Sequence, residues 1–252
     1  MSIAYLNQCL KYTEHPDLFS QDESSKPFVH SYQKIHDSAI NALSLSLPEI
    51  QRLQITEQLI ESLIHLNKHE QANTYLSNLT RKYPLSKRVN LLRGLMLEGS
   101  PDKAIAHYRD ILTSHPTCLK SQKRVIALSL PDDQINMLVE YLDIYSGDQE
   151  AWSYLSGLYE SQGMFRQAIF CVEEMVLANT MLHFNFERLG RLFLEMKDVE
   201  KSLKYYLKAI ELCESDKTSL KGAKRCLDMM EEKTKVHLAL VDMIDMLLNR
   251  LK

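Results

Sequence analysis

The chain has 252 residues, of which 45% are hydrophobic and 25% charged, and its formal net charge at pH 7 is −3. This composition is typical of globular proteins and excludes an extended disordered chain. Only 7 glycines and 7 prolines are present, whereas a β-sandwich, a barrel or a Rossmann sheet needs a Gly- or Pro-bearing turn about every ten residues. We therefore expect a mostly helical protein with short connections.

The N-terminal part, residues 1–52, is expected to differ from the rest of the chain. A short helix near 2–12 leads into a polar stretch at 13–27, which has the composition of a loop. A second helix is expected at about 28–46, and Ser46 and Pro48 suit the start of another. The first residues lack the basic start and long apolar core of a secretory signal.

Residues 53–216 show an internal repeat. At an offset of 34 residues the same residue types recur, and this is the period of the tetratricopeptide repeat. The matched pairs are Trp152 and Phe186, Leu155 and Leu189, Tyr159 and Phe193, Ala168 and Ser202, Val172 and Tyr206, and Met175 and Ala209. Five helix pairs are predicted, at 53–86, 87–116, 117–148, 149–182 and 183–216.

The third of these units is the weakest, because Lys120, Lys123 and Arg124 fall where apolar side chains are expected to pack. A helical stripe of Leu119, Ile126 and Leu130 still favours a helix there, so its register is the open question. Two capping helices follow at about 217–230 and 234–251, in the C-terminal part 217–252.

The fold class is therefore an all-α solenoid, in which helix pairs bury their apolar faces against their neighbours and leave a concave groove. The residues expected to build its core are Trp152, Tyr159, Ala168, Gly190 and Tyr206. Trp152 should contribute most, with a cost of about 3 to 5 kcal/mol on truncation to Ala.

No catalytic or cofactor-binding motif is present. Glycine-rich phosphate loops, Gly-x-Ser-x-Gly and His-Glu-x-x-His are all missing from the sequence. His65 and His69 lie four residues apart, but they flank a predicted turn and have no third ligand nearby. Cys171 is expected to be a packed core thiol rather than a nucleophile. We therefore predict neither an enzyme nor a cofactor or metal site.

The five cysteines are scattered and include no Cys-x-x-Cys pair, so the sequence indicates neither a disulfide framework nor a zinc site. No stretch approaches the roughly 18 uninterrupted apolar residues of a membrane helix. We expect reduced thiols and a cytosolic chain that does not itself cross a membrane.

Charge is segregated along the chain. Residues 81–124 hold ten basic and three acidic side chains, while the remainder is acidic. Such a block could dock an acidic partner, a membrane surface or nucleic acid, or it could merely solvate the outer helix faces. Nucleic acid is the least favoured partner, because no aromatic platform interleaves the basic residues.

One segment is more specific than the general repeat. The run Gly147-Asp-Gln-Glu-Ala-Trp152, followed by Leu155, Leu158-Tyr159 and Ala168-Ile-Phe-Cys171, resembles the central repeats of the family of subunit 2 of the ER membrane protein complex. Arg81-Lys-Tyr-Pro84 and the Asp242-Met243 region are similar to other parts of that family. The resemblance covers about residues 75–252.

This resemblance implies a non-catalytic scaffold on the cytosolic face of the ER, associated with the membrane peripherally through its partners. The complex supports insertion of tail-anchored and multi-spanning proteins, and the implied partners are the cytosolic parts of subunits 3 and 5 and the tail of subunit 1. Partner contacts are expected at groove-facing positions of the first helices. These are Arg88, Leu91, Leu95, Ser121, Val125, Phe184, Glu187 and Arg191.

The alternative is another tetratricopeptide adaptor, or a co-chaperone that binds a peptide in the groove. A co-chaperone that clamps a carboxylate tail needs Lys and Asn at positions 5 and 9 of one first helix. The pairs in this register are Glu57 and Glu61, Leu91 and Leu95, Ser121 and Val125, Ser153 and Gly157, and Glu187 and Arg191. None of these pairs fits, so this alternative ranks lower.

Overall fold

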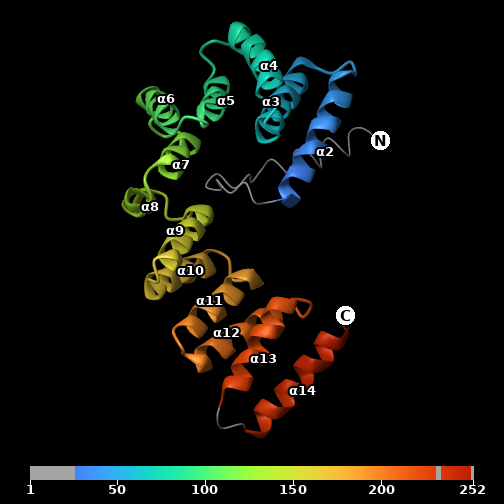
Figure 1. The fold of residues 1–252 in the computed structure, drawn as a ribbon, viewed down its shortest axis with the longest axis vertical. Helices are drawn as coiled ribbons and strands as arrows, with labels where there is room; N and C mark the ends of the chain where they lie inside the picture. The colour runs from blue at the N-terminus through green and yellow to red at the C-terminus, as the bar shows by residue number, and fades with distance from the viewer. Residues whose placement is uncertain (1–25, 231–233, 251–252) are drawn as a thin grey trace. The chain divides into compact units, whose positions relative to one another are not determined.

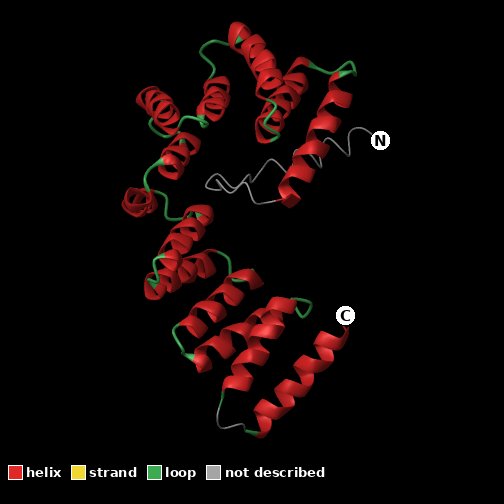
Figure 2. Cartoon of the chain, viewed as in Figure 1, coloured by secondary structure: helices red, strands yellow, loops and turns green. Residues whose placement is uncertain are grey.

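The computed structural model describes residues 26–230 and 234–250, which form α-helices joined by short turns and contain no strand (Figures 1 and 2). The helices are α2 Lys26–Leu43, α3 Glu49–His65, α4 His69–Lys82, α5 Lys87–Leu97, α6 Pro101–Ser114, α7 Leu119–Leu128, α8 Pro131–Ile144, α9 Gln149–Ser161, α10 Phe165–Ala178, α11 His183–Glu195, α12 Val199–Leu212, α13 Lys217–Met229 and α14 Lys235–Arg250. The all-α prediction is confirmed. The expected helix at 2–12, with Cys9, and most of the polar stretch 13–27 lie outside the described residues.

Three of the helix pairs close with the same turn. Asn67, Gly163 and Lys197 each adopt a left-handed backbone, with φ of 57°, 72° and 62°. In each case the next residue donates its N–H to a carbonyl five residues earlier, as in Met164 N to Tyr159 O at 2.9 Å. This closes the last turn of the first helix. The turn recurs although its central residue differs, so a glycine pattern alone would have found only one of the three.

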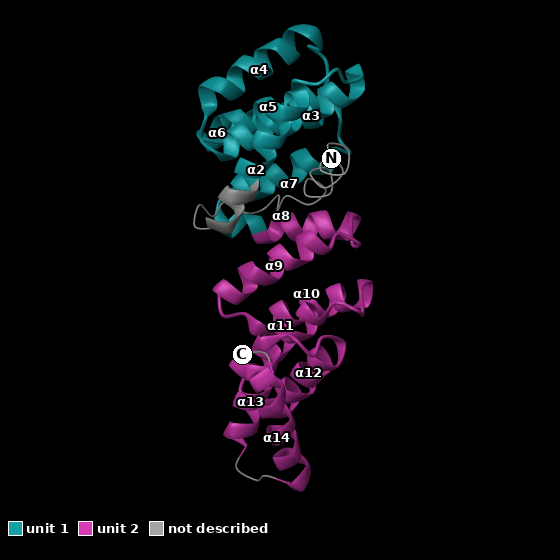
Figure 3. Cartoon of the chain, turned by 90° about the vertical axis from the view of Figure 1, so that its right-hand side faces the viewer, with its two compact units in different colours: residues 1–134 teal, residues 135–252 magenta. Residues whose placement is uncertain are grey.

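The chain divides into two compact units, residues 1–134 and 135–252, which Figure 3 colours separately. This division falls inside α8, within the predicted unit 117–148. The predicted boundary between residues 52 and 53 falls inside α3, because Pro48 already fixes an extended backbone directly before Glu49. The predicted repeat ranges remain an interpretation of the sequence pattern.

The core of the first unit is built around α3. Leu59, Ile60 and Leu63 are fully buried, and they pack with Ala72 and Leu92 from the following helices. Lys120 of α7 is exposed. The other two residues that disturb the repeat pattern are buried, since Lys123 is 7% exposed and Arg124 is 9% exposed. The helix therefore packs through these basic residues rather than turning them to solvent.

The second unit is organised around Tyr206, which is buried on α12. A Cβ added at Gly190 would come within 2.9 Å of Tyr206 Cδ1, and one added at Gly222 would clash with the same ring. Gly190, which the sequence assigned to the core, is therefore the site of a close helix crossing, and Gly222 is a second crossing that the sequence pattern did not predict. Gly94 lies against Tyr108 in the first unit in the same way.

Small residues also carry hydrogen bonds at these crossings. Ser156 Oγ donates to the carbonyl of Ala168 at 3.1 Å, and Ser202 Oγ donates to the carbonyl of Gly190 at 2.7 Å. Both hydroxyls are completely buried. In one helix pair the serine lies on the first helix, and in the next it lies on the second. Both pairs therefore have the same kind of hydrogen bond between their helices, but the helix that supplies the donor differs.

The expectation that Trp152 dominates the core is wrong. Its indole is only partly buried, and so is the ring of Tyr159, whereas Ala168, Gly190 and Tyr206 are buried as predicted. Trp152 Nε1 donates to the carbonyl of Ser146 at 2.7 Å, and this bond holds the ring at the surface of the unit. Truncation of Trp152 is therefore expected to cost less than the value for a fully buried ring.

Candidate functional site

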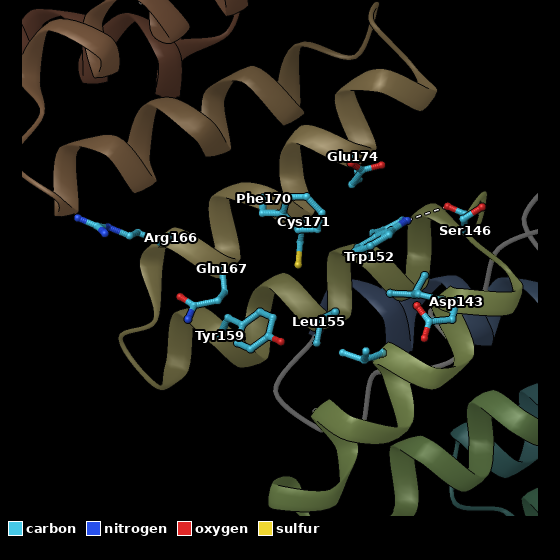
Figure 4. A pocket seen from close by; sticks show the side chains of 12 residues that line it. Asp143, Ser146, Trp152, Leu155, Tyr159, Arg166, Gln167, Phe170, Cys171 and Glu174 are labelled. Atoms are coloured by element: carbon cyan, nitrogen blue, oxygen red, sulfur yellow. Dashed lines mark hydrogen bonds between the residues drawn. The ribbon is translucent and has the colours of Figure 1, made fainter.

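Two features of the structure are candidates for function. One is a set of ion pairs, present within each unit, that join one first helix of the predicted repeats to the next; the pairs of a unit are called its row. The other is a pocket in the second unit, lined by α8, α9 and α10 (Figure 4). Three of the residues that the sequence assigned to partner binding or to the basic block, Arg88, Arg124 and Arg191, take part in these ion pairs.

In the second unit, the row joins α9 to α11 through Glu160. Arg188 Nε donates to Glu160 Oε1 at 2.7 Å, and Arg191 Nη1 donates to Glu160 Oε2 at 2.8 Å. Arg188 also donates to Ser153 Oγ at 3.0 Å. Burial alone would raise the pKa of Glu160, but the two guanidinium groups hold it below its ordinary value.

In the first unit, two equivalent pairs occur. Arg88 of α5 pairs with Glu57 of α3 at 2.5 Å. At the end of α5, Glu98 accepts from Arg124 Nε of α7 at 2.7 Å and from the Tyr108 hydroxyl at 2.8 Å. Burial opposes the charge on Arg124, yet the Glu98 carboxylate holds the pKa of Arg124 above its ordinary value. Both pairs join one first helix to the next.

This arrangement changes how the basic block is understood. Lys82, Arg88 and Arg124 all form ion pairs with glutamates of the same unit. Lys123 is buried. The ten basic residues therefore do not form one free cationic face, and part of their charge serves to tie neighbouring helices together.

The predicted partner-binding residues lie in different surroundings. Ser121 and Val125 are buried, so the prediction that they face a partner is wrong: α7 turns these side chains into its own packing. Leu91, Leu95 and Glu187 are partly exposed, and Phe184 is 64% exposed. Arg88 and Arg191 are exposed but already engaged with Glu57 and Glu160.

The pocket in the second unit has a volume of about 620 Å³. Its walls are Val139 and Leu142 of α8, Trp152, Leu155 and Tyr159 of α9, and Phe170 and Cys171 of α10. Polar groups lie at its margin, namely Asp143, Ser146, Arg166, Gln167 and Glu174 (Figure 4). A pocket of this size with an apolar wall is large enough for more than one side chain of a ligand.

The start of α9 is held by Asp148. Its carboxylate accepts the N–H of Ala151 at 3.2 Å, which caps the helix, and accepts the Tyr141 hydroxyl at 2.7 Å. Trp152 follows directly, and its ring lies edge-on to Phe170 with centroids 6.0 Å apart. The cap, the Tyr141 bond and the indole bond together set the wall of the pocket.

The thiol at the wall of the pocket is not in its reactive form. Burial raises the pKa of the Cys171 thiol to about 12, so the thiol stays protonated at neutral pH. Across residues 26–230 and 234–250, no three His, Cys, Asp or Glu side chains are grouped to hold a metal ion. In the same segments, the four cysteines are free thiols, and Cys118, Cys171 and Cys226 are buried.

Sequence reasoning missed the pocket because it assigned Trp152 to the core. A signal was available in α10, where Arg166, Phe170 and Glu174 follow at intervals of four and so share one helix face. Phe170 is 55% exposed, which is unusual for a phenylalanine on a helix that packs on both neighbours.

The fold and the ion-paired helix row define a protein built from tetratricopeptide-like helix pairs. Residues 63–213 match the family model described as the EMC2 TPR-like repeat domain. The chain therefore belongs to the family of subunit 2 of the ER membrane protein complex, as the resemblance of the Gly147–Trp152 run predicted.

Curated relatives agree with this assignment. ER membrane protein complex subunit 2 of Xenopus tropicalis is 32% identical over 177 residues, which cover 67% of this chain and 60% of the relative. The TPR repeat protein oca3 of Schizosaccharomyces pombe is 32% identical over 173 residues, covering 64% of this chain and 61% of the relative. The matched region of this chain thus spans about three fifths of these relatives.

Among solved structures, MamA 41-end from Desulfovibrio magneticus RS-1 is similar with a TM-score of 0.50 and 16% identity. The match covers 65% of this chain and 96% of that one, and it supports the helical repeat fold alone. No helix within the described part of the chain combines the length and apolar content of a membrane span.

Proposed function

We propose that this protein is a non-catalytic scaffold subunit of the ER membrane protein complex, lying on its cytosolic face. The observation that carries the proposal is the family match over residues 63–213, together with relatives named as subunit 2 of that complex. The protein then acts by holding other subunits in place, and it supports the insertion of tail-anchored and multi-spanning proteins indirectly.

The structure supports a scaffold role through the way in which its helices are fixed. The pairs Glu57–Arg88, Glu98–Arg124 and Glu160–Arg188 each join a first helix to the next one. Such ties between neighbouring repeats restrict the bending of a helical stack. Helices that are held rigidly by these ion pairs suit the binding of several segments at once, because less conformational entropy is lost on association.

The proposed partners are the cytosolic parts of subunits 3 and 5 and the tail of subunit 1. Within the second unit, the exposed Phe184 is the best candidate for an apolar anchor among the predicted contacts. Glu187 and Arg191 follow Phe184 on the same helix and place charged groups on one side of it. In the first unit, Leu91 and Leu95 are the corresponding apolar positions. Association with the membrane then comes from the partners rather than from this chain.

Affinity purification of the tagged protein from detergent-solubilised ER membranes tests the proposal. We expect multi-spanning subunits to co-purify, and we expect high pH to release the protein from membranes while those subunits stay in the pellet. Recovery of soluble chaperones with no membrane protein would refute the scaffold role and favour the co-chaperone alternative.

A pair of variants sharpens the experiment. Phe184→Asp should reduce the recovered partners several-fold, because the exposed aromatic side chain that a partner would cover is lost. Leu85→Asp is the matched control, since Leu85 is 91% exposed and was not assigned to the contact surface. Equal losses from the two variants would show that Phe184 has no special place in the interface.

A further inference from the structure

The pocket of the second unit has a charge pattern that the scaffold role does not use. On α10, Arg166, Phe170 and Glu174 lie along one face at intervals of four residues. The apolar residue is therefore flanked by a cation on one side and an anion on the other. With the helical rise of about 1.5 Å per residue, the Cα atoms of Arg166 and Glu174 are separated by about 12 Å along the helix.

The residues of α8 and α9 agree with this separation of a basic end and an acidic end of the pocket. The turn between α9 and α10 lies next to Tyr159 and Arg166, since Met164 N donates to Tyr159 O at 2.9 Å. Trp152 and Glu174 lie at the far end of that hairpin. The bond from Trp152 Nε1 to the carbonyl of Ser146 brings the C-terminal end of α8 to this same end.

Asp143 therefore joins Glu174 at the Trp152 end, while Arg166 lies at the Tyr159 end (Figure 4). Within the described residues, none of these three side chains takes part in an ion pair or a side-chain hydrogen bond. This distinguishes them from Glu160, Arg188 and Arg191, which already form ion pairs with one another between α9 and α11. Asp143 and Arg166 are exposed, and Glu174 is partly exposed.

The wall between these two ends is apolar and open. Phe170 is 55% exposed and Val139 is 41% exposed, whereas Leu155 is buried beneath them. Exposed aromatic and branched side chains around a pocket, with charges at the rim, are the features of a protein-binding site. Cys171 lies at the wall as a protonated thiol and adds to its apolar character.

We propose that this pocket binds a short extended segment of a partner protein that carries apolar side chains between a basic and an acidic residue. The basic residue of the segment lies against Asp143 and Glu174, and its acidic residue lies against Arg166. The distance of about 12 Å corresponds to about four residues of an extended chain, at roughly 3.3 Å per residue. Partner recognition then depends on the order of the two charges as well as on the apolar anchor.

The test uses the isolated full chain and blocked synthetic peptides. Two peptides have the charge order of the proposal in the two chain directions, Lys-Leu-Phe-Leu-Glu and Glu-Leu-Phe-Leu-Lys. Three controls are Glu-Leu-Phe-Leu-Glu, Lys-Leu-Phe-Leu-Lys and Lys-Ser-Ser-Ser-Glu. Trp152 is the only tryptophan of the chain, so its fluorescence reports directly on the pocket.

We expect one of the two dipolar peptides to shift the Trp152 emission in a saturable manner, and to bind at least about fivefold more tightly than every control peptide. Failure of both dipolar peptides to bind overturns the proposal. Equal binding of the doubly acidic or doubly basic peptide also overturns it, because the pocket would then bind apolar side chains without regard to the charges beside them.

Variants that leave the fold intact locate the effect, with binding followed by the anisotropy of a labelled peptide. Phe170→Ala should weaken the preferred peptide at least about fivefold. Leu177→Ala is the matched control, since Leu177 is 74% exposed on the same helix but does not line the pocket. Glu174→Lys should reduce or reverse the preference for the dipolar peptide over the doubly acidic one. An unchanged preference in that variant refutes the charge pattern.

The inference stands apart from the scaffold function, because it concerns one unit of the isolated chain. If the peptides bind but no membrane subunit co-purifies, only the scaffold role fails. Analytical ultracentrifugation of the chain alone tests whether a second copy of this chain occupies the pocket. Self-association that Phe170→Ala abolishes would assign the pocket to a second copy of this chain and overturn the proposal.

Discussion

Removal of the Glu98 carboxylate should destabilise the first unit strongly. Glu98 accepts hydrogen bonds from Arg124 and Tyr108, and the Arg124 side chain is only 11% exposed. In Glu98→Ala the buried guanidinium loses this counter-charge, and the Tyr108 hydroxyl loses its acceptor. Breaking a buried ion pair from one side costs about 3 to 5 kcal/mol. We take the lower end, about 3 kcal/mol, because Glu98 itself is 18% exposed.

The measurement is urea unfolding of the full chain, followed by far-UV circular dichroism, with wild type and variant under the same conditions. Glu49→Ala is the matched control, because Glu49 pairs with Lys82 across α3 and α4 at the surface of the same unit. Both of those side chains are more than half exposed, so this variant should cost less than about 1 kcal/mol.

The double variant Glu98→Leu with Arg124→Met separates charge from shape. Replacing both partners of a buried pair by apolar side chains is often close to neutral. We therefore expect it to recover at least about half of the loss seen in Glu98→Ala. The reasoning is refuted if Glu98→Ala costs no more than Glu49→Ala, or if the double variant is the least stable of the three.

Three further predictions concern the second unit. The folded state lowers the pKa of Glu160 from its ordinary 4.5, so this carboxylate adds stability above that pH and loses it as the pH falls through the folded value; Glu160→Gln should therefore flatten the acid side of the thermal stability profile. Burial instead raises the pKa of Glu187, so Glu187→Gln should raise the melting temperature at pH 7, and this gain should vanish in acid, where the wild-type carboxyl is protonated. A melting temperature difference that does not vary with pH would contradict both. Gly190→Ala should cost about 1 to 3 kcal/mol of unfolding free energy, because its Cβ meets the Tyr206 ring. Gly157→Ala, whose nearest neighbour is an Arg188 nitrogen at 3.8 Å, should be neutral or stabilising. Equal effects of the two glycine variants would show that Tyr206 does not limit this crossing.

The helices were predictable from the sequence because the repeat reports local packing. Leu155 and Leu189, or Ala168 and Ser202, recur at one offset since each helix pair must bury the same kind of face. At α3 the two sequence signals differ: the repeat comparison begins its first unit at residue 53, whereas Ser46 and Pro48 indicate an earlier helix start. The helix begins at Glu49, directly after Pro48. A period gives the spacing of elements better than it gives their ends.

The third unit shows why periodicity cannot decide the packing of a charged residue. Lys123 and Arg124 occupy positions where the repeat register predicts buried apolar side chains. Both side chains are in fact buried, although they are basic. For Arg124, what makes the burial possible is Glu98, which lies 26 residues earlier in the chain. The compensation for a buried charge depends on a contact between distant residues, and no pattern within α7 contains it.

The pocket shows the opposite case. Trp152 belongs to the repeat signature, but it is only partly buried. A large residue at the position of Trp152 is buried only if the neighbouring helix supplies a side chain to cover it. Phe186, at the equivalent position in the next pair, is 8% exposed, while Trp152 remains partly open beside Phe170. The repeat pattern specifies the residue type at a position, but the neighbouring repeat decides its exposure.

Comparison of the two second helices at the repeat offset identifies what is particular to this site. The α12 positions that correspond to Arg166, Phe170 and Glu174 are Glu200, Lys204 and Lys208, which are all charged and exposed. Lys208 pairs with Glu211 of the same helix. A solvated outer face needs no phenylalanine, and α12 has none at that position. The aromatic residue and the reversed order of charges on α10 are therefore not a requirement of the fold, which is the physical reason to look for a ligand there.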